Sequence, residues 1–131
     1  LAPSVGGSRS GRGRAPVKRD AMVCLGDMLD YARDIEVFVA GMDTRGFADD
    51  RKTQYAVLRA LEVIGEAAKR VPPETQARFP DIPWRQIIGM RNVIAHDYLG
   101  ISVPRIYETA TVFIPRLTKR LPDLIAELNS D

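Results

Sequence analysis

The sequence predicts an all-α protein, an up-and-down bundle of four main helices. Apolar residues recur at three- and four-residue steps through four long stretches, the spacing of a helix that buries one face. Glycines and prolines separate these stretches, and no stretch alternates apolar and polar residues as a half-buried strand does. At 131 residues and 45% hydrophobic content, the chain is long enough for one domain with its own core.

The first helix is expected to run from about Arg19 to Gly41, where glycine suits a left-handed C-cap. Residues 42–48 are expected to form a loop, after which Asp49 or Asp50 can cap the next helix. The buried stripe of the first helix consists of Met22, Leu25, Met28, Leu29, Ala32, Ile35 and Val39.

The second helix is expected to end where Pro72 and Pro73 follow Val71. Residues 73–78 are predicted to form one helical turn. The third helix begins near Pro83, whose missing N–H needs no partner in a first turn, and ends before Gly100. The stripe of the second helix consists of Val57, Leu61, Ile64 and Ala68, widened by Leu58 and Gly65.

The last helix is expected to begin after a cap at Ser102. Pro115 lies inside its apolar pattern and removes one backbone hydrogen bond, so a kink is predicted between Thr111 and Pro115. Pro122 predicts a second bend. The stripe of this helix consists of Ile106, Ala110, Phe113, Leu117, Leu121, Leu124 and Leu128.

Residues 1–17 are rich in Gly, Ser, Arg and Pro, and they are predicted to be a disordered basic tail. Because the chain starts with Leu, the tail is interpreted either as a native basic arm or as an artefact of cloning. The helical domain is expected over residues 18–131. The tail holds three arginines and no acid, so the rest has 16 basic and 17 acidic residues and a net charge of −1. Nucleic-acid binding therefore needs a local basic patch.

The single cysteine, Cys24, cannot form an intrachain disulfide and fits a reducing compartment, so a cytoplasmic location is expected. It is interpreted as a small buried hydrophobic residue. One His and one Cys argue against a zinc site within one chain, and no cofactor is expected. No apolar run is long enough to cross a membrane, and no secretory signal is visible.

The segment that carries the chemistry contains Arg91, His96 and Tyr98, and His96 is the only histidine of the chain. Arginine offers a planar set of donors for a phosphate, and histidine transfers protons near neutral pH. On an ideal helix Arg91 and His96 point about 140° apart, whereas Asn92 and His96 share a side. The motif acts as a unit if Arg91 curls round the helix, if the helix loosens near His96, or if a second subunit supplies its own copy.

The Arg-x4-His-x-Tyr spacing, with Asn92 straight after the arginine, resembles the motif of HEPN ribonucleases, and more closely that of HepT-like toxins. Gly41-Met42-Asp43, the segment Leu61–Arg70, and Ile82–Arg85 leading into Ile88–Asn92 extend this resemblance over about residues 18–131. It implies a HEPN-like homodimer whose two motifs face each other. Such a dimer also brings two histidines into one cleft, which supplies both a base and an acid.

The resemblance implies a metal-independent endoribonuclease toxin with an RNA substrate. His96 is the expected general base or acid, Arg91 the phosphate-binding cation, and Asn92 an orienting or phosphate-binding residue. Tyr98 is the expected AMP acceptor for a cognate nucleotidyltransferase antitoxin. Since seven residues make about two turns, its hydroxyl is expected near Arg91, where AMP would neutralise the cation. Tyr107 is the alternative acceptor.

Several features have a structural alternative. Glu62 and Glu66 are either an acidic pair supporting the site or part of a solvated helix face. Trp84 either stacks on a base or anchors a core or dimer contact. His96 can instead cap a helix end or form a hydrogen bond inside the core, and Arg91 can instead form a structural salt bridge. The alternative functions are a non-catalytic nucleotide- or RNA-binding subunit of a nucleotidyltransferase and a helical assembly module. Basic pairs that could line an RNA path are Arg51-Lys52, Lys69-Arg70 and Lys119-Arg120.

Overall fold

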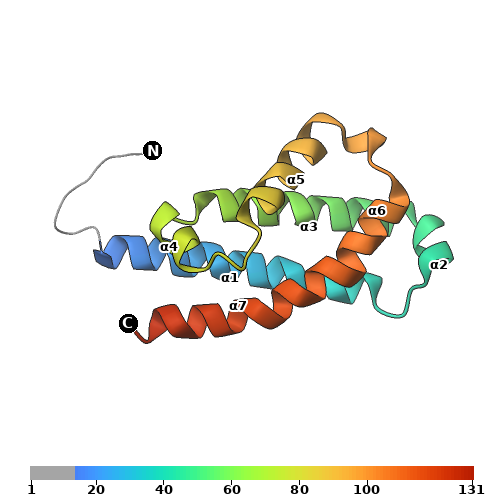
Figure 1. Cartoon of the computed structure of the whole chain (residues 1–131). Helices are drawn as coiled ribbons and strands as arrows, with labels where there is room; N and C mark the ends of the chain where they lie inside the picture. Colours follow the sequence, from blue (N-terminus) through green and yellow to red (C-terminus); the bar gives the residue numbers. More distant parts are fainter. Residues whose placement is uncertain (1–13) are drawn as a thin grey trace.

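The computed structural model describes residues 14–131, and every regular element in that range is a helix (Figure 1). The predicted all-α bundle of four main helices is confirmed, with short helical turns between them. The elements are α1 (Arg14–Val39), α2 (Thr44–Ala48), α3 (Arg51–Arg70), α4 (Pro73–Arg78), α5 (Trp84–His96), the 3₁₀ turn η2 (Tyr98–Gly100), α6 (Val103–Glu108), the π-helical η3 (Thr109–Phe113) and α7 (Ile114–Asn129).

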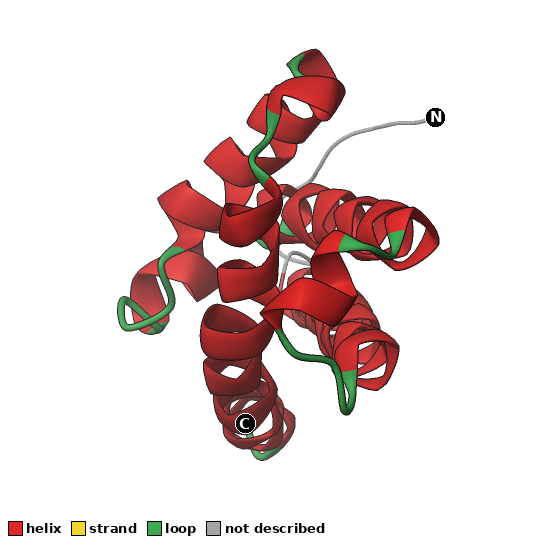
Figure 2. Cartoon of the chain, turned by 90° about the vertical axis from the view of Figure 1, so that its right-hand side faces the viewer, coloured by secondary structure: helices red, strands yellow, loops and turns green. Residues whose placement is uncertain are grey.

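The long helices α1, α3 and α7 form the body of the bundle, and α5 packs on α3 (Figure 1). Seen from the end, the helices surround a shared interior (Figure 2). One core cluster fills that interior, and its largest fully buried side chains include Phe47, Leu25, Met28, Ile35, Ile64, Ile87, Ile94, Ile114, Leu121 and Leu124. No helix in the described range is long and apolar enough to cross a membrane.

Three predicted helix ends are confirmed by their caps. Gly41 follows α1 with a φ of 76°, the left-handed conformation that favours glycine. The Asp50 carboxylate accepts a hydrogen bond from the backbone N–H of Thr53 over 3.0 Å at the start of α3. Ser102 caps α6 by accepting from the N–H of Arg105 over 3.2 Å. These contacts satisfy backbone groups that a helix end leaves unpaired.

Two boundaries differ from the prediction. Helix α1 begins at Arg14, inside the segment predicted as a tail, and residues 1–13 of that predicted tail lie outside the described residues. The segment predicted as a loop contains α2, because the Asp43 side chain accepts from the N–H of Gly46 over 2.7 Å and starts a helical turn.

The segment predicted to kink, Thr111 to Pro115, overlaps the π-helical segment η3 between α6 and α7. Pro115 has no N–H to continue the α-helical pattern, and single π-helical turns inside α-helices are one way in which that pattern is locally interrupted. Helix α7 then continues through Pro122 without interruption. Cys24 is buried as predicted, and burial raises the pKa of its thiol.

Candidate ribonuclease site

Helix α5 carries the Arg91–His96 motif, and its buried residues fix how the motif faces the bundle. Ile87 and Ile94 lie in the core. Trp84, the first residue of the helix, is 8% exposed, and its indole N–H donates to the backbone carbonyl of Phe79 over 3.0 Å. The interpretation of Trp84 as a core anchor is therefore confirmed, and its buried ring is not available to a nucleobase.

Arg91 lies where α5 comes closest to α3. A Cβ on Gly65 of α3 would lie only 2.3 Å from the Cβ of Arg91, so glycine alone permits this approach. The buried Nε of Arg91 lies 2.8 Å from Glu66 Oε2, as an ion pair that is not aligned as a hydrogen bond. Its Nη1 donates to Asn92 Oδ1 over 3.1 Å. Two neighbours thus hold the guanidinium at the α3–α5 contact.

His96 is the last residue of α5 and is exposed. Its imidazole makes no hydrogen bond or ion pair with any residue from 14 to 131, so it is not a histidine bonded inside the core. Because the helix is regular between them, Arg91 and His96 point about 140° apart. Asn92 shares a side with His96, and its bond to Arg91 draws the cation toward that side.

The two glutamates of α3 have different partners. Glu66 pairs with Arg91, whereas Glu62 pairs with Arg59 three residues earlier on its own helix, at 3.1 Å. The structure therefore brings Glu66 to the arginine of the motif and leaves Glu62 in a local surface pair. Such exposed local pairs contribute little to stability.

The expectation that the Tyr98 hydroxyl lies near Arg91 is wrong. It assumed two further turns of helix, but α5 ends at His96, and Tyr98 lies in the turn η2. Its hydroxyl is 3.5 Å from the carbonyl oxygen of Tyr55, while Arg91 contacts Glu66. Tyr55 and Glu66 are eleven residues apart on α3, which is about 16 Å of helix axis.

Tyr55 was missed by the sequence interpretation. Its ring lies 5.8 Å from the ring of Tyr98, and its hydroxyl accepts a hydrogen bond from Arg51 over 2.6 Å. The four-residue spacing of Arg51, Tyr55 and Arg59 could have indicated a shared helix face. The basic pair on α7 has a structural contact instead, since Arg120 pairs with Asp81 at 2.6 Å.

The motif lies on an open surface. A pocket of about 590 Å³ beside it is lined from α5 by Met90, Val93 and Ile94, and neither Arg91 nor His96 lines it. Within the described residues, no group of three His, Cys, Asp or Glu side chains is arranged to hold a metal ion. Figure 1 places the start of α1 and the end of α7 at the far end of the bundle from the C-terminal end of α5.

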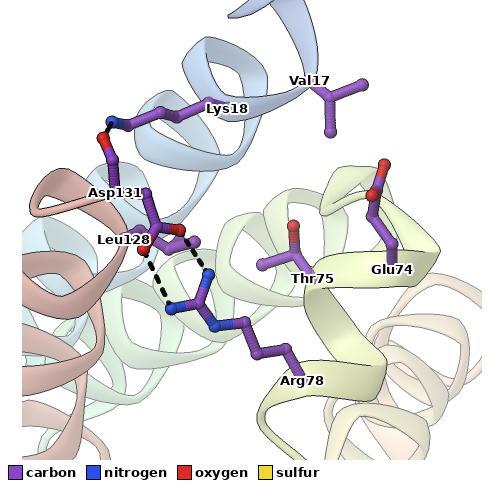
Figure 3. Close-up of a pocket in the computed structure, with 7 residues that line it drawn as sticks. All are labelled: Val17, Lys18, Glu74, Thr75, Arg78, Leu128 and Asp131. Carbon is purple, nitrogen blue, oxygen red and sulfur yellow. Dashed lines mark hydrogen bonds and ion pairs between the residues drawn. The ribbon is translucent and has the colours of Figure 1, made fainter. Parts of the chain in front are cut away.

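A second pocket, of about 390 Å³, lies at that far end, where Lys18, Arg78 and Asp131 meet (Figure 3). Lys18 Nζ donates to the backbone oxygen of Asp131 over 3.0 Å, and Arg78 is paired with the Asp131 carboxylate. These contacts tie α1, α4 and the end of α7 together, so this pocket is separate from the motif.

The described part of the chain is thus an all-α bundle that presents an arginine and an exposed histidine from one helix. Comparison with known proteins gives the family. The model of the HepT-like ribonuclease family matches residues 28–124. The chain belongs to this family.

Two curated relatives illustrate the similarity. The chain is 39% identical to "Putative RNase MJ0125" of Methanocaldococcus jannaschii, over 85% of this chain and 96% of that protein. It is 37% identical to "Probable ribonuclease HepT" of Thermococcus cleftensis, over 82% of this chain and 98% of that protein. No solved structure matches the chain.

Proposed function

We propose that the chain is a metal-independent endoribonuclease of the toxin type, which acts as a homodimer and is silenced by AMP transfer to Tyr98 from a cognate nucleotidyltransferase. The observation that carries the proposal is that α5 presents two residues: an exposed His96 with no side-chain partner among the described residues, and an Arg91 held by Asn92 and by Glu66 of α3. The names of the relatives support a ribonuclease activity.

RNA offers its own nucleophile, the ribose 2′-hydroxyl. In the proposed step, its oxygen attacks the neighbouring phosphorus while a base removes its proton, and an acid protonates the departing 5′-oxygen. His96 fills the first role and His96 of a second copy the other. Arg91 stabilises the charge that develops on the phosphoryl oxygens. Each chain has one histidine, so two copies complete the pair of proton-transfer groups.

Glu66 is proposed to position Arg91. It contacts Nε, and Asn92 accepts a hydrogen bond from Nη1. The remaining donors of Nη2 can meet a phosphate, because a guanidinium offers five N–H groups. The carboxylate is exposed enough that solvent screens the pair, so its contribution is orientation rather than stability.

Gly89 supports the approach of a second copy to this face of α5. A Cβ at this position would meet no atom of the described residues within 4 Å, so packing within the chain gives no reason for glycine. Glycine in a helix interior destabilises it by about 1 kcal/mol relative to alanine. Gly89 and Val93, which lies one turn later and is 55% exposed, form a strip of surface beside Asn92 and His96 that no other part of the chain covers within the described residues.

Gly89→Ala is therefore expected to raise the free energy of unfolding of the chain by about 0.5–1 kcal/mol. The same variant is expected to weaken the dimer and lower cleavage, because the added methyl group lies on the proposed contact face. Urea unfolding, analytical ultracentrifugation and an RNA cleavage assay measure the three effects. A variant that is more stable, equally dimeric and equally active would remove Gly89 from the interface.

The direct test of the proposal is RNA cleavage by protein purified without its antitoxin. Activity is expected to be unchanged in EDTA, since the proposed steps use only side chains of the protein. Mass analysis first establishes that Tyr98 is unmodified. If EDTA abolishes cleavage and Mg²⁺ restores it, a metal performs the step assigned to His96 and the mechanism fails.

Tyr98→Phe is expected to prevent inactivation. Burial, and next the neighbouring Tyr55, raise the pKa of the Tyr98 hydroxyl. Like any tyrosine hydroxyl it is protonated at neutral pH and loses its proton when AMP is attached. Intact mass after incubation with the nucleotidyltransferase and ATP should show adenylyl groups on the wild type and none on the variant. The matched control is Tyr107→Phe, since the Tyr107 hydroxyl already donates to the carbonyl of Met42 over 2.8 Å. Equal modification of wild type and Tyr98→Phe would move the acceptor elsewhere.

A further inference from the structure

An aromatic and basic cluster lies on α3 next to the end of α5. Arg51, Tyr55 and Arg59 follow one another at four-residue steps, so they occupy one side of the helix. Tyr55 is 38% exposed, and the guanidinium carbon of Arg51 lies 5.6 Å from the centre of its ring. The ring of Tyr98 supports Tyr55 at 5.8 Å with the planes tilted by 40°. We refer to Arg51, Tyr55 and Tyr98 as the tyrosine platform.

The contacts of the platform hold it in place. The Arg51 side chain is fixed by its 2.6 Å hydrogen bond to the Tyr55 hydroxyl and by its position near the ring. The Tyr98 hydroxyl points to the backbone of Tyr55 at 3.5 Å. An aromatic pair at this distance and tilt is a favourable arrangement. The exposed part of Tyr55 is therefore a rigid surface with a cation at its edge.

The charges around the platform favour an anion. Arg51 is the first residue of α3, where the helix dipole also favours negative charge. One turn beyond Tyr55, the Arg59 side chain is 70% exposed and paired with Glu62 alone among the described residues. Two of the acids nearby are engaged, since Asp50 caps α3 through Thr53 and Glu62 pairs with Arg59.

The platform is continuous with the proposed active site. Tyr98 follows His96 after one residue, and α3 carries both Tyr55 and the Glu66 that holds Arg91. About 16 Å of helix axis separate Tyr55 from Glu66, a distance that a strand of a few nucleotides spans. A single strand lying across the Arg91–His96 site therefore extends onto the platform.

We propose that the tyrosine platform is a subsite for single-stranded RNA, in which one nucleobase stacks on Tyr55 and an adjoining phosphate is bound by Arg51. Sequence-tolerant readers of single strands combine an aromatic face for bases with cations for the backbone, and the platform offers both. This inference rests on the proposed ribonuclease function. A group attached to the Tyr98 hydroxyl would lie against this subsite, which gives modification a way to exclude RNA without reaching Arg91.

The test measures binding of a fluorescein-labelled single-stranded RNA of about ten nucleotides to His96→Ala protein, by fluorescence anisotropy, so that cleavage does not interfere. Adding Tyr55→Leu is expected to weaken binding about 10-fold, within the range of one lost base stack. Tyr55→Phe keeps the ring but loses the hydrogen bond to Arg51, so it should bind less tightly than the parent and more tightly than Tyr55→Leu. The matched control is Tyr31→Leu, since Tyr31 is 37% exposed on α1.

Two further arms separate the base from the phosphate. With a matched oligonucleotide of abasic residues, the difference between Tyr55→Leu and its parent should be much smaller, because only the hydrogen bond that holds Arg51 is then lost. Arg51→Gln, an exposed change that spares the core, should reduce the salt dependence of log K by about one counterion. The control is Arg33→Gln, at an exposed position on α1. Circular dichroism verifies that each variant is folded.

The subsite is overturned if Tyr55→Leu weakens abasic and normal RNA equally, if Tyr55→Phe binds as poorly as Tyr55→Leu, or if Tyr31→Leu has the same effect. If the wild type cleaves RNA and Tyr55→Leu binds RNA normally, the subsite is rejected and the proposed ribonuclease function stands. If RNA binding depends on Tyr55 but the wild type does not cleave RNA, the ribonuclease proposal is rejected and the RNA subsite stands.

Discussion

Replacing His96 with alanine is expected to lower the rate of RNA cleavage by about 10³-fold, within the range that a general acid or base contributes. The helical circular dichroism and the free energy of unfolding should stay close to those of the wild type. His96 is exposed and makes no side-chain bond within the described residues, so its removal leaves no cavity and no unpaired buried group. A loss of activity in a stable protein separates a catalytic role from a structural one.

Chemical rescue makes this test specific. Because the His96 side chain lies at the surface at the end of α5, free imidazole can diffuse into the space it leaves. Partial recovery of cleavage by His96→Ala in imidazole is expected, and Arg91→Ala should show no such recovery, because its defect is in phosphate binding. Cleavage by His96→Ala at the wild-type rate would remove the proton-transfer mechanism.

Local signals in the sequence were sufficient for the fold. Gly41, Asp50 and Ser102 each mark a helix end by backbone conformation or by a side chain that reaches its own helix, and such effects depend only on neighbouring residues. The predicted apolar stripes also match the buried faces of the helices, because burial follows helical spacing. The missed helix α2 is short, and its cap at Asp43 is the only signal that precedes it.

The site was harder to predict, because its contacts join different helices. The spacing of Arg91, Asn92 and His96 is visible in the sequence, but the contact of Arg91 with Glu66 depends on how α5 crosses α3. The position of Tyr98 was predicted wrongly because a helix end at His96 cannot be read from spacing alone. The platform at Tyr55 is also a product of two helices meeting.

The open surface around the motif suits both a second copy of the chain and an extended substrate. A phosphate bound only by Arg91 would remain in contact with water, which weakens its interaction with the cation. A second copy covering the strip at Gly89 would exclude that water and add its own histidine. An RNA strand that also reaches Tyr55 gains binding away from the reacting phosphate, which helps to hold the reacting atoms in place.

Gly65→Ala is expected to have the largest effect on the fold and site together. A Cβ at this position would lie 2.3 Å from the Cβ of Arg91 and 3.0 Å from the carbonyl oxygen of Ile87, so α5 has to move away from α3. Such overpacking lowers the free energy of unfolding by about 1–3 kcal/mol. It also shifts Arg91 from Glu66, and a displacement of about 1 Å at a catalytic group can reduce the rate about 10²-fold.

The matched control is Gly26→Ala on α1, since a Cβ there would meet no atom of the described residues within 4 Å. Alanine should stabilise that helix by about 1 kcal/mol and leave cleavage unchanged. Urea unfolding and RNA cleavage, measured on both variants, separate the general effect of alanine in a helix from the effect of crowding at Arg91. If Gly65→Ala were as stable and as active as Gly26→Ala, the close contact of α3 with α5 would not be what positions the arginine.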